Sequence, residues 1–200
     1  MHFANRANVT ASEVASIREI DKARFQAFVA TTLFGEGVML FGQFAMLMNF
    51  KRNNMFKGQA TIVQWSVRDE DMHVQLLCKL AKQHFKHIDQ ATQRDYYYEV
   101  ASVLMPLILG FVDYCYSAGT PEGLSQEVVY KFLGYQATRR ARQAGILDSD
   151  KEFSRISPLP WFDQMIGGTE FTNFFERRAT AYSKGNLVGV WDYTEAFKLI

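Results

Sequence analysis

An unbroken helical pattern is the feature that most constrains how this chain folds. Apolar residues recur at helical spacing from about residue 11, and the pattern continues to about residue 50. The chain has only four prolines, and three of them follow residue 120. Proline interrupts helices, so its scarcity before residue 120 favours helices, as does a pattern that repeats with the period of a helix. No segment shows a strong strand pattern and no internal repeat occurs, so we predict an all-α fold.

The first predicted helix begins at about Ala11, because Thr10 and Glu13 have the spacing of a capping box. It extends to about Phe50. A helix of about forty residues with internal glycines should be bent or locally bulged, and such distortions often occur at functional sites. The glycines concerned are Gly35, Gly37 and Gly42.

Three more helices are predicted, over about 59–86, 91–117 and 125–143. After Leu147 the long periodicity is lost. We therefore expect two parts, a helical bundle half over 1–147 and an extended segment with a flexible C-terminal tail over 148–200.

Composition excludes several classes of partner. Hydrophobic residues make up 48% of the chain and charged residues 22%, with a formal net charge of +1. This balance gives no electrostatic reason to expect a nucleic acid or an anionic membrane. The apolar runs are too short and interrupted for a bilayer span, and the N-terminus does not resemble a signal peptide. We expect a soluble cytoplasmic protein in which Cys78 and Cys115 are buried free thiols.

Three potential metal ligands are predicted to meet. Glu70 and His73 are three positions apart, so they share one face of a helix. The helical pattern breaks at Asn53 and Asn54. If the helices before and after this break form an antiparallel hairpin, Glu36 lies at the same height as the Glu70 and His73 pair.

A metal ion would explain why a carboxylate stands in an apolar stretch. Glu36 lies within "TLFGEGVMLF", where an unpaired buried charge would cost several kcal/mol. One Glu and a neighbouring Glu-x-x-His form half of a carboxylate-bridged di-iron or di-manganese centre in a helical bundle. Oxygen and imidazole donors suit these metals better than a structural zinc site. The alternative is that Glu70 and His73 only line a solvated helix face.

Four segments together resemble the small, radical-generating subunit of class I ribonucleotide reductase. "VRDEDMH" is similar to the family's R-D-E-x-x-H helix, and "GLSQEVVYKFLGYQATRRARQAGI" resembles a following helix. "FSRISPLPWFDQM" resembles an N-P-x-P-W segment, with Ser157 in place of Asn, and "TEFTNFFERRATAYSKG" resembles F-F-x-x-R-x-x-x-Y-x-x-G. The resemblance implies a ferritin-like helical bundle, and it covers nearly the whole chain.

The resemblance also implies roles for individual residues. Glu36, Glu70 and His73 would bind the second of two irons, or of two manganese ions. Asp69 would match an aspartate that hydrogen-bonds a tryptophan and another histidine ligand. Phe44 would shield the radical, and Tyr182 would relay it. The tail "VWDYTEAFKLI" would dock on the large catalytic subunit.

The chain departs from the family in its number of ligands. Such a centre takes six, and only three occur here, because no second Glu-x-x-His exists among the 200 residues. His84 and His87 lack a glutamate three positions earlier, so they are interpreted as an exposed or interface pair. We therefore expect a second small-subunit polypeptide to supply an Asp, a Glu-x-x-His and the radical tyrosine, and the assembled small subunit to be a dimer. A fragment of a longer protein is the other explanation.

Two alternative functions remain open at this point. In the first, two copies of the chain form a symmetric homodimeric di-iron oxidase with one di-metal site per pair. In the second, the chain is a non-catalytic helical partner of the large subunit.

Overall fold

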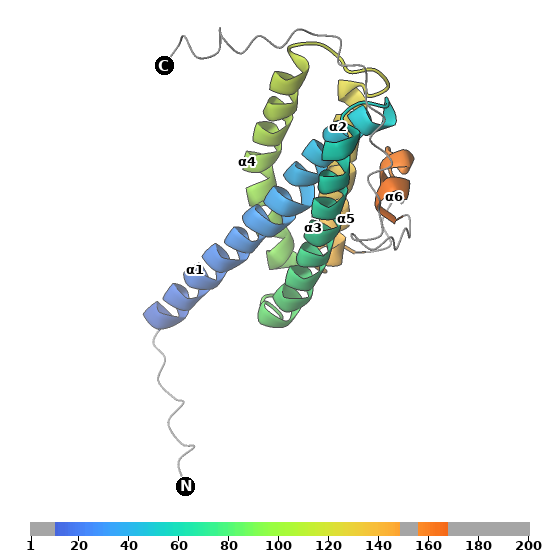
Figure 1. The fold of residues 1–200 in the computed structure, drawn as a ribbon. Coiled ribbons are helices and arrows are strands. Elements are labelled where there is room, and N and C mark those ends of the chain that lie inside the picture. Colours follow the sequence, from blue (N-terminus) through green and yellow to red (C-terminus); the bar gives the residue numbers. More distant parts are fainter. Residues whose placement is uncertain (1–10, 149–155, 168–200) are drawn as a thin grey trace, which may run out of the picture. The chain divides into compact units, whose positions relative to one another are not determined.

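The computed structural model describes residues 11–148 and 156–167 (Figure 1). The chain divides into two units, Met1–Gly167 and Gly168–Ile200, and every described residue belongs to the first. All regular elements in the described ranges are helices, which confirms the all-α prediction. Their bounds are α1 (Ala11–Phe28), η1 (Val29–Met39), α2 (Leu40–Arg52), α3 (Lys57–His84), α4 (Gln90–Tyr116), α5 (Gln126–Gln143) and α6 (Pro160–Gly167).

The long first helix is present, and its interior is distorted as predicted. α1, η1 and α2 follow one another without a break, and η1 is a π-helix of 11 residues. At its end the backbone N–H of Leu40 donates to the carbonyl of Gly35, five residues earlier, instead of four as in an α-helix. Glu36 lies within this π-helix. Thr10, which we predicted to cap the helix, lies outside the described residues.

A turn after α2 reverses the chain at the predicted position. Asn53 caps α2, and Asn54 has a left-handed backbone with φ of 66°. Asparagine tolerates this conformation better than most residues. The side-chain amides of Asn49 and Asn53 both donate to the carbonyl of Glu122, at 2.9 and 2.8 Å. The turn is therefore fixed to the segment that leads into α5.

η1 is the centre of the bundle, because it contacts α3, α4 and α5 as well as its own neighbours in the chain (Figure 1). Apart from Arg140, the largest fully buried side chains are aromatic or aliphatic. Burial of such surface contributes about 25 cal/mol per Å², which makes this core the main source of stability. Its fully buried members include Phe25, Leu33, Phe34, Phe41, Met48, Phe132, Leu133 and Phe162.

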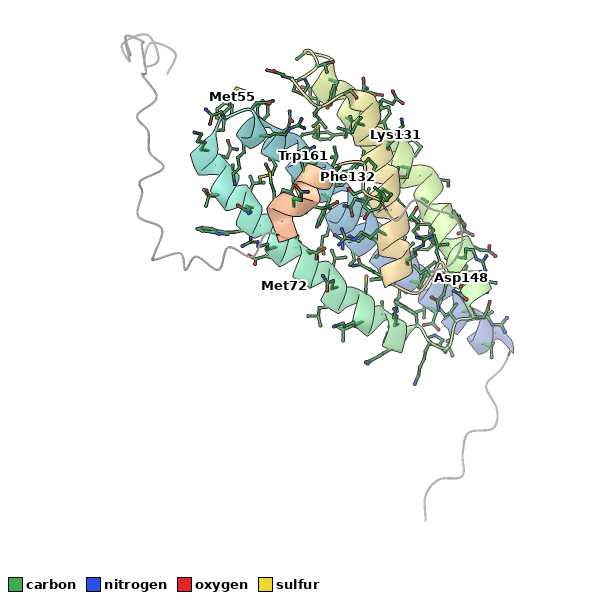
Figure 2. All side chains as sticks on the ribbon, turned by 90° about the vertical axis from the view of Figure 1, so that its right-hand side faces the viewer. Met55, Met72, Lys131, Phe132, Asp148 and Trp161 are labelled. Atoms are coloured by element: carbon green, nitrogen blue, oxygen red, sulfur yellow. The ribbon has the colours of Figure 1, made fainter. Side chains whose placement is uncertain are left out.

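One short helix was not predicted. α6 lies within 148–200, where we expected extended chain. It begins at Pro160, a residue that suits the first turn of a helix. The side-chain amide of Gln64 on α3 donates to the carbonyl of Met165 at 2.6 Å, and Phe162 packs edge-on against Phe132 at 5.4 Å. Figure 2 shows α6, on which Trp161 is labelled, beside the part of α5 that bears Phe132. Tertiary packing therefore stabilises a helix that is too short to be evident from periodicity.

Ser157 occupies the position where the resembling family segment has Asn. It is buried, and its Oγ accepts a hydrogen bond from the backbone N–H of Leu159 at 3.2 Å. The serine hydroxyl thus provides a local turn contact of the kind that asparagine also makes.

The prediction for the cysteines was half wrong. Cys78 and Cys115 are both free, and Cys78 is buried, but Cys115 is exposed. The outer side of α4 is uncovered, so an apolar neighbourhood in the sequence did not imply burial. By length and composition alone, the stretches Val14–Arg52 and Gln90–Tyr116 could cross a membrane, although the core helix of a soluble protein meets the same criterion.

Candidate metal centre

Glu36, Glu70 and His73 come together as the hairpin geometry predicts. Glu36 lies on η1 and the other two on α3, and one potential ligand atom from each lies within 4.8 Å of the others. His73 Nδ1 is 3.1 Å from Glu36 Oε2 and 3.6 Å from Glu70 Oε2. The antiparallel packing of α3 on η1 and α2 is what places these residues at one height.

The electrostatics of this cluster favour a cation. Glu36 Oε2 and Glu70 Oε2 are buried oxygen atoms without a hydrogen-bond partner among the described residues. Two carboxylates held together in this way repel each other, and one imidazole, that of His73, lies within 4 Å of both. A metal ion bound by all three groups would offset this repulsion. Carboxylate oxygens and one imidazole are donors suited to iron or manganese. The three residues therefore fit half of a di-metal centre.

The centre is open on one side. The side chains of Glu36 and Glu70 are 29% and 30% exposed, and that of His73 is 50% exposed. A completed metal site in a bundle has its ligands directed inward from all sides. The exposed side is therefore where further donors would have to approach.

Sequence reasoning missed one charged pair beside the centre. Arg140 on α5 is fully buried, and its Nη1 lies 2.8 Å from Asp71 Oδ1 on α3. Burial lowers the pKa of Arg140, the charge of Arg139 acts in the same direction, and Asp71 opposes both. The only sequence signal was the basic cluster "RRARQ", which we attributed to the chemistry of a helix C-terminus.

The other predicted residues have mixed outcomes. Asp69 is exposed on α3, and no hydrogen bond or ion pair to another described residue is found for it, so its orienting role stays a prediction. Phe44 is half-buried and packs edge-on against Phe41 at 6.0 Å. Tyr182 and the C-terminal tail lie outside the described residues, and their roles stay predictions as well.

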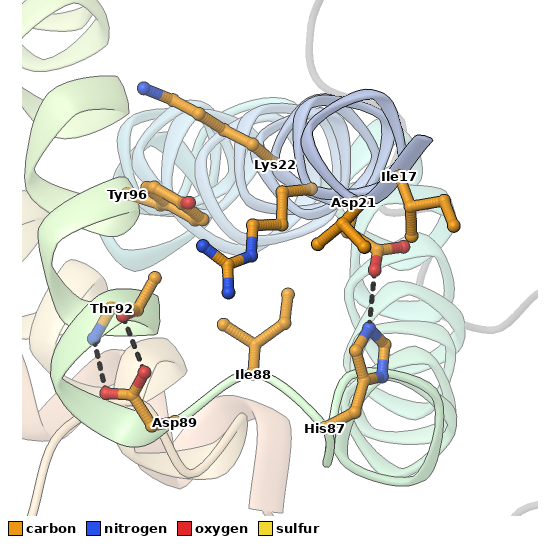
Figure 3. A pocket seen from close by; sticks show the side chains of 10 residues that line it. Ile17, Asp21, Lys22, His87, Ile88, Asp89, Thr92 and Tyr96 are labelled. Atoms are coloured by element: carbon orange, nitrogen blue, oxygen red, sulfur yellow. Dashed lines mark hydrogen bonds and ion pairs between the residues drawn. The ribbon is translucent and has the colours of Figure 1, made fainter. Parts of the chain in front are cut away.

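His84 and His87 are both exposed, as predicted, but they have different surroundings. His87 Nε2 lies 2.7 Å from Asp21 Oδ2 on α1, at a cavity of about 540 Å³ between α1 and the start of α4 (Figure 3). Asp89, whose side chain caps α4 by accepting from the backbone N–H of Thr92, lines the same cavity, as does Thr92. It is separate from the Glu36 cluster, because the two share no lining residue.

Most of this chain matches a known protein family. The sequence model of the family described as "Ribonucleotide reductase, small chain" matches residues 2–152. The chain belongs to the ribonucleotide reductase small-chain family. Members of this family are all-α, ferritin-like proteins, which the helical structure matches.

Relatives come from viruses and bacteria. A probable ribonucleoside-diphosphate reductase small subunit of Invertebrate iridescent virus 3 is 32% identical over 86% of this chain and 44% of its own length. The corresponding protein of Invertebrate iridescent virus 6 is 27% identical over 94% of this chain and 60% of its own length. The ribonucleoside-diphosphate reductase subunit beta of Chlamydia pneumoniae is 24% identical over 76% of this chain and 44% of its own length. The chain thus spans about half the length of the curated relatives it matches.

Proposed function

We propose that this chain provides half of the di-metal centre of a ribonucleoside-diphosphate reductase small subunit. The observation that carries the proposal is the convergence of Glu36, Glu70 and His73, with two buried carboxylate oxygens that accept no hydrogen bond from the described residues. Family membership supports the same reading. When bound, the two metal ions supply the oxidising chemistry that generates a radical for deoxyribonucleotide synthesis.

Each residue of the chain has a distinct task in this proposal. Glu36, Glu70 and His73 hold iron, with manganese as the alternative metal. Asp69 orients a histidine ligand and a tryptophan supplied from outside the described residues. Tyr182 relays the radical, and the C-terminal tail docks on the large catalytic subunit.

The rest of the centre would come from a second small-subunit polypeptide carrying an Asp, a Glu-x-x-His and the radical tyrosine. The exposed side of α3 supports this, because it carries an apolar stripe beside the metal ligands. Met72 projects from α3 in Figure 2 and is 64% exposed. An interface that completes a bundle resembles a domain core cut in two. The stripe consists of Ile62, Trp65, Met72, Leu76 and Leu80, all exposed.

Asp69 lies within the same stripe by helical position, between Trp65 and Met72. A carboxylate within an apolar interface needs a partner from the opposite surface. An imidazole or indole N–H on the completing polypeptide would satisfy it. We further propose that the assembled small subunit is dimeric and acts in the cytoplasm, or in the host cytoplasm for a viral protein.

Metal counting tests the proposal. The full chain is purified alone and together with a polypeptide that carries the missing Asp, Glu-x-x-His and Tyr. We expect about two metal ions and a radical spectrum in the reconstituted pair, and no stoichiometric metal in the chain alone. Glu70→Ala should abolish metal binding and radical formation without preventing association, whereas Glu127→Ala, an exposed residue on α5, should change neither.

The alternatives give different results in the same experiment. Two metal ions per two identical chains, without a second polypeptide, would support the homodimeric oxidase. Association with the large subunit that persists with no metal in any preparation would support a non-catalytic partner. Metal analysis of the reconstituted pair distinguishes iron from manganese.

A further inference from the structure

We infer that Arg140 is a positioning residue that fixes the register between the two segments bearing the carboxylate ligands. This inference rests on the proposed metal centre. Arg140 contacts the residue that immediately follows each carboxylate ligand, namely Gly37 after Glu36 and Asp71 after Glu70.

The contact with η1 depends on the glycine. Arg140 Nε donates to the carbonyl oxygen of Gly37 at 3.4 Å. A Cβ atom at position 37 would lie 2.8 Å from Arg140 Cγ and 3.2 Å from Arg140 Cδ, closer than such atoms normally approach. The arginine side chain therefore crosses the π-helix directly beside Glu36, where only a glycine leaves room.

The contact with α3 is an ion pair with the carboxylate of Asp71, which a second side chain also holds in place. Arg140 Nη1 lies 2.8 Å from Asp71 Oδ1, and Asp71 Oδ2 accepts from the side-chain amide of Gln75 at 2.7 Å. The carboxylate of Asp71 is thus held on both oxygens. Since Asp71 and Glu70 share a peptide bond, a shift of α3 past η1 would break this pair.

The guanidinium itself is held in place by α5 and α2. Arg140 is fully buried, its Cζ lies 4.4 Å from the ring centre of Phe41, and Nη1 also donates to Gln143 Oε1 at 2.8 Å. Nη2 is buried and has no hydrogen-bond partner among the described residues. A buried pair with one nitrogen unsatisfied is poorly optimised for stability, and buried ion pairs in general add little to it. Their best-attested contribution is to specify a register.

A metal-independent measurement tests the register. Nitroxide labels are placed on Thr31→Cys in η1 and Lys79→Cys in α3, both exposed positions, in a Cys115→Ser chain. The dipolar coupling between the labels reports the distance between them. We expect a narrow distribution of this distance in the parent chain and a broadened or shifted distribution in Arg140→Met. Lys131→Met, which removes an exposed ion pair on the same helix, is the control and should change nothing.

Binding of Co²⁺ to the chain reconstituted with the polypeptide that carries the missing ligands provides the second readout. Because a change next to metal ligands typically weakens affinity by about 10-fold to 100-fold, we expect a loss of this size in Arg140→Met. The double variant Arg140→Met/Asp71→Leu replaces the ion pair by apolar groups, which often preserves stability. The double variant should therefore regain the thermal midpoint of the parent chain, but neither the narrow distribution of label distances nor the Co²⁺ affinity.

The outcomes separate this inference from the proposed function. Arg140 does not set the register if Arg140→Met leaves both the label distances and the Co²⁺ affinity unchanged. The same conclusion follows if the double variant restores both. If the reconstituted pair takes up no Co²⁺, the proposed metal centre is wrong, and the distances between the nitroxide labels alone decide the role of Arg140.

Discussion

Glu36 Oε2 and His73 Nδ1 lie 3.1 Å apart, although one belongs to a π-helix and the other to the next helix of a hairpin. The turn at Asn53 and Asn54 determines which residues of the two helices face each other. The turn therefore brings Glu36 of η1 beside His73 of α3, and this cluster is seen only when both helices are considered together.

Replacing one carboxylate should separate metal binding from stability. In the metal-free chain, Glu36→Gln removes repulsion with Glu70 and keeps an amide oxygen that can accept from His73 Nδ1, so the thermal midpoint should stay the same or rise. A bound metal adds about 2.7 kcal/mol at a concentration 100 times its dissociation constant, and this gain should be lost in the variant. Thermal melts of the chain alone measure the first effect, and melts of the reconstituted pair with and without Co²⁺ measure the second. A variant that keeps the metal-dependent rise would exclude Glu36 as a ligand.

Alanine at position 37 should be destabilising. Its Cβ would meet Arg140 Cγ at 2.8 Å, and such overpacking typically costs about 1–3 kcal/mol. Gly110 on α4 provides the matched control, because a Cβ there meets nothing within 4 Å. Gly110→Ala should stabilise by about 0.4–1 kcal/mol. Urea unfolding of both variants checks the sign of each effect, and equal changes would contradict the close approach of Arg140.

The apolar stripe of α3 predicts where the completing polypeptide binds. Leu76 is 55% exposed, so Leu76→Glu should change the folding free energy by no more than about 0.5 kcal/mol. The same charge within an interface should abolish association with the polypeptide that carries the missing ligands. Sedimentation of the mixture measures this. Lys131→Glu on α5 should leave association intact, and a Leu76→Glu chain that still associates would place the interface elsewhere.

The two thiols should react at very different rates. Burial raises the pKa of Cys78, which lowers its thiolate fraction and restricts access, whereas Cys115 is exposed. A thiol reagent such as dithionitrobenzoate should modify one cysteine quickly in the native chain and the second only on unfolding. Cys115→Ser should remove the fast phase. Two equally fast phases would mean that the face of α3 that carries Cys78 is not buried as described.

The cap of α4 predicts a dependence on acid. Hydrogen bonds from the side chain and backbone N–H of Thr92 lower the pKa of Asp89 below its ordinary 3.8. The stabilisation is therefore complete above about pH 4 and is lost as pH falls through the lowered pKa. Asp89→Asn still accepts a hydrogen bond but does not titrate there. Its thermal midpoint should fall less than that of the parent chain between pH 5 and pH 2, which melts across this range would measure.

The helices and the convergence of Glu36, Glu70 and His73 were predictable because both depend on spacing along the chain. Period and caps place α3, α4 and α5 within a few residues of their observed ends. The hairpin break then determines which residues face each other. α6 was missed because eight residues hold too little periodic information, and packing on α3 and α5 stabilises it.

The sequence by itself determined the all-α class, the distorted first helix and the meeting of Glu36 with Glu70 and His73, because these follow from local periodicity and one turn. Only the tertiary structure decided that Cys115 is exposed and that Arg140 is buried beside both ligand segments. Burial depends on which neighbours cover a helix face, and a charged residue is buried only where distant partners compensate it. Neither condition can be inferred from the residues that neighbour Cys115 or Arg140 in the sequence.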